Sequence, residues 1–396
     1  MDWQSILVKA AAALGREAGG RVAIRDPSPV TEGWAAQQGE YPGVRRCVVS
    51  GLPGCTSVIV KTLRPVGDVR AGNTIAREWA ALTLLAELGA NVGARVFAHG
   101  EKFLVLEDLG RGPAVEDLLV GDDRAAATEA LVALATAVGA MQAISWGHEA
   151  TFRRRVEAAG IDTRADRVTI ARSTVADRWA TLRELAATGA GLPSTSVADA
   201  DIEELNARLA EPGPLLALSS GDVAPQNCRL EDRSLRLLDF EEASYRHALL
   251  DVASLRLPFC GAPCWSRLPV EVTDAMEGAV RAELGRSCPE VLDARTYATG
   301  MAVATAAWAV TRLVRLPKLL AEDEPHPMGF SRRGQLLDTI QCAIDAAAVA
   351  GALDDLRSWF EQAAVALRRI WPGLPPQQQL YPAFRSDEGR RDPRRS

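Results

Sequence analysis

The sequence predicts an α+β fold in two lobes, a small lobe built on an antiparallel sheet and a larger helical lobe. Strand-forming segments bounded by turns gather before residue 110, whereas the chain beyond is rich in alanine and leucine at helical spacing. A length of 396 residues is enough for two cores of ordinary size. We expect an N-terminal helix at 1–20, an N-lobe at 21–110, a C-lobe at 111–375 and a disordered tail at 376–396.

Composition excludes several classes of function. The formal net charge of −6 argues against nucleic acid as a partner. The seven cysteines are scattered and odd in number, which indicates reduced thiols in a cytoplasmic protein. Residues 1–20 have the spacing of an amphipathic helix rather than a signal peptide, and the alanine-rich run 296–311 is short for a bilayer. We therefore expect no membrane partner, and the oligomeric state stays open.

Three strands are predicted in the first lobe, at 21–25, 44–50 and 57–63. Between the first two strands lies a polar stretch that contains glycines at positions 33, 39 and 43. Glycine lets a backbone approach a phosphate group closely. The spacing matches no tight nucleotide motif, and a plain surface loop explains these glycines equally well.

Lys61 lies near the end of the third strand, and a helix is predicted to follow from about Asn73. The helix carries Glu78 beside an apolar stripe formed by Ile75, Trp79, Leu82, Leu85 and Leu88. A lysine in this position is often an edge residue whose amine reaches solvent. A strand lysine with a helix glutamate is also the pair that holds the α- and β-phosphates in kinases. A hairpin at 94–98 and 102–109 completes the first lobe.

The most informative stretch runs from residue 215 to residue 240. An apolar strand ends in Ser219–Ser220–Gly221–Asp222, and Asn227 follows five residues after Asp222. A predicted hairpin over residues 229–238 then returns Asp239 to the same place. Phosphoryl transfer needs such a set, because one carboxylate accepts the proton of a hydroxyl while a carboxylate and an amide hold Mg²⁺. Asp and Asn are common loop residues, so the hairpin spacing carries the prediction.

The segments 221–227 and 238–241 resemble the catalytic and metal loops of the aminoglycoside phosphotransferase family, which belongs to the protein-kinase-like superfamily. The sequence Val-Ile-Val-Lys that ends at Lys61, together with Glu78, resembles the family as well. The resemblance covers roughly residues 20–320 and implies a two-lobed kinase-like fold. One position differs: the family has His before Gly-Asp, and this chain has Ser220.

The resemblance implies a role for each matching residue. Asp222 would be the catalytic base, and Asn227 with Asp239 would hold Mg²⁺. Lys61 and Glu78 would place the phosphates of ATP.

At the adenine end, the backbone carbonyl of Glu107 and the amide of Leu109 would bind the base edge, and Leu238 would form the floor. Asp251 would support the catalytic loop. Residues 151–212 would help to shape the acceptor cleft, although their charges are more simply explained as solvated helix faces. Further helices are expected at 271–285, 291–317, 331–350 and 352–370.

The predicted function is ATP- and Mg²⁺-dependent transfer of the γ-phosphoryl group to a hydroxyl. The acceptor would be a small molecule, such as an antibiotic or metabolite, or a peptide Ser or Thr in natural-product biosynthesis. The alternative is a pseudokinase-type binding or scaffolding protein, which Ser220 and the glycine spacing favour. The retained set of Lys61, Glu78, Asp222, Asn227 and Asp239 favours the enzyme.

Overall fold

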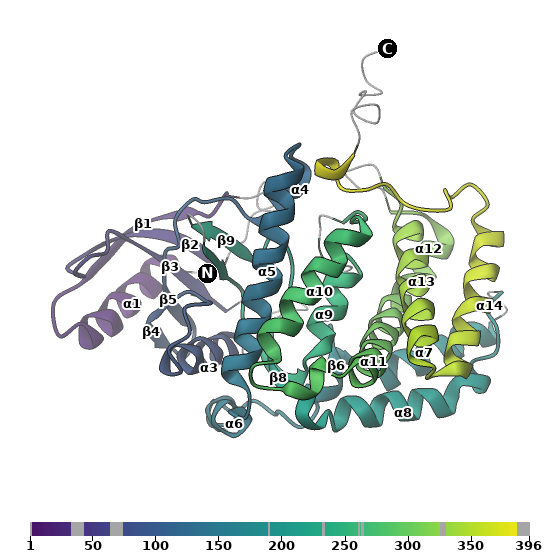
Figure 1. Cartoon of the computed structure of the whole chain (residues 1–396). Helices are drawn as coiled ribbons and strands as arrows, with labels where there is room; N and C mark the ends of the chain where they lie inside the picture. Colours follow the sequence, from purple (N-terminus) through teal and green to yellow (C-terminus); the bar gives the residue numbers. More distant parts are fainter. Residues whose placement is uncertain are drawn as a thin grey trace, which may run out of the picture.

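The computed structural model describes residues 2–32, 43–63, 74–188, 191–231, 234–259, 262, 265–324 and 330–385. The first lobe consists of α1 (Trp3–Glu17), β1 (Ala23–Pro29), β2 (Val44–Ser50), β3 (Ser57–Thr62), α3 (Thr74–Glu87), β4 (Val96–Gly100) and β5 (Phe103–Glu107). Figure 1 shows this sheet and α1 on one side of the molecule and the helices of the second lobe on the other. The predicted α+β fold is confirmed. Gly33, Gly39 and Asn73 lie outside the described residues.

The second lobe is helical with short strands between the helices. Its elements are α4 (Val115–Val120), α5 (Arg124–Ser145), α6 (Glu149–Ala158), β6 (Thr169–Ile170), β7 (Ser173–Thr174), α7 (Val175–Ala187), α8 (Asp199–Ala210), β8 (Leu216–Ser219), β9 (Cys228–Glu231), β10 (Ser234–Leu237), β11 (Ser244–His247), α9 (Leu249–Arg256), α10 (Val270–Leu284), α11 (Ala294–Arg312), α12 (Leu316–Ala321), α13 (Arg332–Ala350) and α14 (Asp354–Ile370). The single helix expected at 291–317 is divided. Asp293 caps the start of α11 by accepting the N–H of Thr296, and a 3₁₀ turn separates α11 from α12.

The five strands of the first lobe pair antiparallel in the order β1-β2-β3-β5-β4. Successive side chains of a strand point to opposite faces, so β3 divides its residues between two environments. Val58 and Val60 are fully buried in the core under α1. Ile59 and Lys61 face the second lobe and line a cleft there.

The inner face of the sheet shares one hydrophobic core with the second lobe. Leu104 and Leu106 of β5, the buried stripe of α3 and the buried residues of α5 belong to the same cluster. Helix α5 runs along the junction of the lobes (Figure 1). It is the one helix in the described part of the chain that is long and apolar enough to cross a membrane, and more than half of that window is buried inside the protein.

The predicted disorder of residues 376–396 is wrong for the part that is described, which ends at residue 385. Tyr381 is fully buried and Phe384 is 4% exposed. The backbone pairs with Arg267, whose N–H donates to Gln379 and whose carbonyl accepts from Tyr381. The segment ends in a 3₁₀ turn that packs against α4 and α5. Its aromatic residues are too few and too irregularly spaced to produce a helical or strand pattern, so no local pattern indicates this packing.

Candidate active site

Strand β8 delivers the predicted catalytic loop, and β11 lies beside it. The two strands pair antiparallel with Ser219 opposite Ser244, so the same register places Gly221 opposite Glu242. Gly221 has a φ of +90°, and a Cβ atom there would lie 2.3 Å from the carbonyl oxygen of Glu242. Only glycine fits this turn. Asp222 follows it with an exposed side chain.

Asp251, near the start of α9, supports this loop from the core. Its carboxylate accepts hydrogen bonds from the Ser219 hydroxyl at 2.6 Å and from the Gln142 amide at 3.2 Å. The Ser219 oxygen in turn accepts the N–H of Gly221 at 3.0 Å. Arg246 donates both to Asp251 at 3.2 Å and to the carbonyl of Gly221 at 3.3 Å. These contacts hold both backbone groups of Gly221, as expected of a supporting Asp251.

Asn227 connects this loop to the β9–β10 hairpin. Its Nδ2 atom donates to the backbone carbonyl of Asp222 at 3.0 Å and to the Asp222 carboxylate at 3.1 Å. The N–H of Leu238 donates to the carbonyl of Asn227 at 2.9 Å. The predicted hairpin is confirmed, and it brings Asp239 to the cleft that Asn227 also lines.

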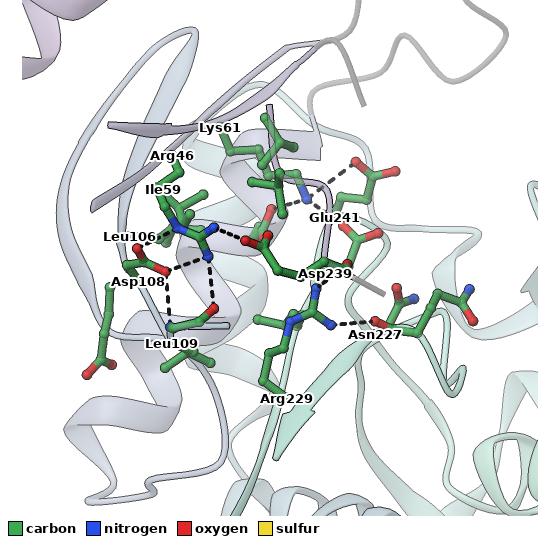
Figure 2. A pocket seen from close by; sticks show the side chains of 18 of the residues that line it. Arg46, Ile59, Lys61, Leu106, Asp108, Leu109, Asn227, Arg229, Asp239 and Glu241 are labelled. Atoms are coloured by element: carbon green, nitrogen blue, oxygen red, sulfur yellow. Dashed lines mark hydrogen bonds and ion pairs between the residues drawn. The ribbon is translucent and has the colours of Figure 1, made fainter. Parts of the chain in front are cut away.

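Lys61 is the centre of a buried cluster of charges (Figure 2). Its Nζ atom lies 2.7 Å from Glu78, contacts the Asp239 carboxylate and lies 3.6 Å from Glu241. Burial alone would lower the pKa of Lys61, but the attraction of the three carboxylates outweighs burial and raises this pKa. Burial raises the pKa of Glu78, and Lys61 opposes that rise. The predicted pair of Lys61 and Glu78 is present, and it extends to Asp239.

The donor groups of this cluster fit Mg²⁺. One lysine faces three carboxylates, which leaves an excess of negative charge beside the cleft. The carboxylates of Asp239 and Glu241 and the side-chain oxygen of Asn227 are hard donors of the kind Mg²⁺ prefers. Among the described residues, no three His, Cys, Asp or Glu side chains form a metal site of their own. An ion held here would therefore take further ligands from phosphate oxygens and water.

Glu241 is a cleft residue to which sequence reasoning assigned no role. Its side chain is 8% exposed and lies next to Lys61. Its position two residues after Asp239, on the same turn, could have indicated that Glu241 lies in the cleft.

The other end of the cleft is apolar. Val44, Ile59, Leu106 and Leu238 line it. The N–H of Leu109 donates to no atom of the residues that the structure describes. The Glu107 side chain instead accepts hydrogen bonds from the N–H of Arg95 and from Arg236, both at 3.0 Å. Apolar side chains and the chain segment 107–109 therefore meet at this end of the cleft.

A network of charges that the sequence did not indicate lines part of the cleft. Arg46 donates two hydrogen bonds to Asp108, at 2.7 and 3.0 Å (Figure 2). It also pairs with Glu32. Arg229 of β9 donates to the backbone carbonyl of Glu32 at 3.1 Å. The pKa of Asp108 is lowered, because hydrogen bonds from Arg46 and Ser57 outweigh its burial. These partners lie far apart in the sequence, so no local pattern reveals them.

The structure brings the predicted cofactor residues to the wall of one cleft: Lys61, Glu78, Glu107, Leu109, Asn227, Leu238 and Asp239. Asp222 is not part of that wall and lies beside it, bonded to Asn227. The arrangement can hold a phosphate chain and a hard cation with a carboxylate next to them. The individual roles stay predictions.

Comparison with known proteins finds similarity to solved structures only at the level of the fold. No protein-family model matches the chain, and no curated protein matches it either.

Solved structures that resemble the chain include a choline kinase from Cryptosporidium parvum Iowa II, at 12% identity and a TM-score of 0.49 over 91% of this chain and 100% of that one. An ethanolamine kinase from Plasmodium vivax matches at 11% identity and a TM-score of 0.47, covering 89% and 83% of the two chains. A macrolide 2′-phosphotransferase from Brachybacterium faecium matches at 17% identity and a TM-score of 0.43, covering 80% and 93%. Likeness at this level does not determine an activity, so function is argued from the site.

Proposed function

We propose that the protein is a phosphotransferase that uses Mg²⁺ and ATP to phosphorylate a hydroxyl group. The acceptor is a small molecule or a peptide Ser or Thr. Residues 21–110 bind the nucleotide, and residues 111–375 supply the catalytic loop, the metal loop and the acceptor cleft. One observation carries the proposal: Lys61 contacts both Glu78 and Asp239 in the cleft that Asn227 shares, while Asn227 bonds to Asp222.

This combination of groups suits phosphoryl transfer better than simple binding. A loose transition state needs positioned charges more than covalent chemistry. When bound, Mg²⁺-ATP supplies the phosphoryl group and balances its charge. Lys61 holds the phosphates, and Glu78 keeps its ammonium group in place. Asn227 and Asp239 hold the metal ion.

Asp222 accepts the proton of the attacking hydroxyl. The hydrogen bond from Asn227 orients the Asp222 carboxylate, whose side chain is exposed to an incoming acceptor. Gly221 and Asp251 fix the backbone from which Asp222 projects. The same amide therefore couples the base to the metal site.

The proposal is tested with two variants that separate binding from transfer. Asp222→Asn keeps the shape of the side chain but removes its charge, so transfer should fall about 10²–10⁴-fold while Mg²⁺-ATP still binds. Asp239→Ala should remove both transfer and the Mg²⁺-dependent part of nucleotide binding. Asp274→Asn, on the exposed side of α10, is the matched control and should change neither. Transfer is followed by mass spectrometry of an acceptor panel, and binding by thermal shift.

At free nucleotide about 100-fold above Kd, binding should stabilise the fold by about 2.7 kcal/mol. No shift at millimolar Mg²⁺-ATP contradicts the nucleotide site. Binding without transfer to any acceptor, and without a difference between wild type and Asp222→Asn, would identify a binding or scaffolding protein instead.

A further inference from the structure

A short hairpin in the second lobe turns through two residues with unusual backbone angles. Strands β6 and β7 pair with Thr169 opposite Thr174, and the turn between them consists of Ala171 and Arg172. Their φ angles are +46° and +70°. Two-residue turns with positive φ at both positions strongly prefer Asn-Gly, because other side chains crowd the backbone there. Neither residue of this turn is a glycine or an asparagine.

The side chain of Arg172 reaches the segment that follows the metal loop. Its Nε atom donates to the Glu242 carboxylate at 2.6 Å, and one Nη atom contacts the same oxygen. Glu242 is the residue whose backbone closes on Gly221, with 2.3 Å from its carbonyl oxygen to a Cβ built at Gly221. Gly221 directly precedes Asp222. A chain of contacts therefore runs from the hairpin tip to the backbone of the predicted base.

Stability does not explain this arrangement. The side chains of Arg172 and Glu242 are 38% and 26% exposed, and ion pairs this accessible to solvent stabilise a fold little. A glycine at position 172 would suit the turn better. Strained residues cluster at functional sites, so the contact of the Arg172 side chain with Glu242 is the feature to explain.

A second set of contacts links the segment before this hairpin to the residue that follows Glu242. Arg77, the neighbour of Glu78 on α3, donates to Asp166 at 2.7 and 2.8 Å and to the carbonyl of Ala243 at 3.2 Å. Asp166 lies in the 3₁₀ turn directly before β6. Glu242 is therefore held directly by Arg172, and Ala243 is held by Arg77, which Asp166 fixes in place.

We propose that Arg172 is a positioning residue of the catalytic loop, acting through Glu242 on Gly221 and thereby on Asp222. This inference rests on the proposed function for its kinetic consequence. It gives part of the 151–212 segment a role in holding the catalytic loop, instead of a solvated surface alone. Loss of the Arg172 side chain lets Gly221 and Asp222 move relative to the acceptor, while the nucleotide cleft keeps its own contacts.

The decisive variant is Arg172→Gly, because it relieves the strained turn and removes the ion pair at once. We expect its Tm to equal or exceed that of wild type, its thermal shift with Mg²⁺-ATP and its KM for ATP to be unchanged, and its kcat to fall about tenfold or more. A merely structural arginine would show the opposite pattern, a lower Tm with normal turnover. Arg172→Lys should recover part of kcat. The charge exchange Arg172→Glu with Glu242→Arg should exceed either single variant in kcat.

Two controls accompany it. Ala171→Gly relieves strain in the same turn and keeps Arg172, so kcat should not change. Arg164→Ala removes a nearby arginine whose side chain is 89% exposed and which, among the described contacts, pairs only with Asp162. Its kcat should also stay at the wild-type value. Wild-type kcat in Arg172→Gly overturns the proposal.

Amide hydrogen exchange separates this inference from the proposed function. Exchange across residues 219–227 should be faster in Arg172→Gly than in wild type, whether or not an acceptor is known. If wild type transfers no phosphoryl group but the exchange rates differ, the proposed function fails and the positioning contact stands. Equal exchange overturns the positioning role.

Discussion

Two residues of the candidate site adopt backbone conformations that most side chains avoid. Gly221 does so without cost, whereas Asp239 has a φ of +61° and carries a Cβ atom. Such a conformation costs on the order of 1–3 kcal/mol and persists where the surroundings hold it. Here the ion pair with Lys61 holds it. The strain directs the Asp239 carboxylate toward the cleft, where the predicted metal site lies.

Ser220, the residue that departs from the resembling family, is 3% exposed. Next to Ser220, Arg246 supports the loop, because it bonds to Asp251 and to the Gly221 carbonyl. We expect Ser220→Ala to keep kcat/KM for transfer within about tenfold of wild type, because a neutral hydrogen bond contributes on the order of 1 kcal/mol.

In contrast to Ser220→Ala, Arg246→Met should lower the free energy of unfolding. It leaves Asp251 as a buried carboxylate without its cation, and breaking such a pair costs roughly 3–5 kcal/mol. A drop in kcat/KM of Ser220→Ala comparable to that of Asp222→Asn would show that Ser220 takes part in the chemistry.

At the level of elements, the local sequence pattern was enough to predict helices and strands with a clear hydrophobic periodicity. Strand β2 occupies Val44–Ser50 as predicted, and α10 and α13 begin and end within one residue of the predicted bounds. The order and spacing of Lys61, Glu78 and Asp239 likewise placed them in one cleft. Hydrophobic periodicity and turn residues carry this much information because they act over a few neighbouring positions.

Elements that depend on distant partners were not predictable in this way. Strand β11 reads Ser-Tyr-Arg-His and has no apolar run, yet all four residues are buried by pairing with β8. Its polar groups form hydrogen bonds with residues that are distant in the sequence. The Tyr245 hydroxyl, for example, donates to the carbonyl of Ser145 at 2.7 Å. The charge network around Arg46 is of the same kind, since Asp108 lies 62 positions away in the sequence. Such contacts follow only from the fold.

The C-terminal segment gives a prediction at this scale. Truncation after Pro376 removes the fully buried Tyr381 and the nearly buried Phe384 from the surface of α4 and α5. Loss of a buried aromatic residue costs about 3–5 kcal/mol, so the free energy of unfolding should fall by at least that amount. Truncation after Arg385 keeps both aromatic residues, so it is the matched control and should retain a higher free energy of unfolding than the shorter chain. Chemical denaturation measures both, and equal midpoints for the two truncations would refute the packing of this segment.

For the whole molecule, the shared core makes the two lobes interdependent. The inner face of the sheet, α3 and the helices of the second lobe bury their apolar side chains in one cluster, while α1 and the outer face form a smaller one. The cleft therefore lies directly over the main core. Ionisable groups buried in the second lobe then influence the stability of the entire fold.

Two of these groups respond to pH in opposite directions. Burial lowers the pKa of His247 from its usual 6.5 to about 4, and its neutral Nδ1 atom accepts the N–H of Leu249 at 3.3 Å. Burial raises the pKa of Asp338 from 3.8 to about 6, although Arg267 opposes the rise. Between about pH 6.5 and 4, the unfolded chain binds a proton at His247 that the folded chain does not bind. At Asp338 the folded chain is the one that binds the extra proton as the pH falls through about 6.

Comparison of wild type with His247→Asn and Asp338→Asn should therefore give difference curves of opposite sign. From pH 7 to pH 4.5, the free energy of unfolding of wild type should fall relative to His247→Asn, by up to about 3 kcal/mol, since each unit of pKa shift is worth 1.36 kcal/mol. Over the same pH range, the free energy of unfolding of wild type should rise relative to Asp338→Asn. The rise should be smaller, because the Asp338 side chain is partly exposed. Urea denaturation at a series of pH values measures both differences. Curves of the same sign would mean that one of the two groups is not held in its neutral form by the fold.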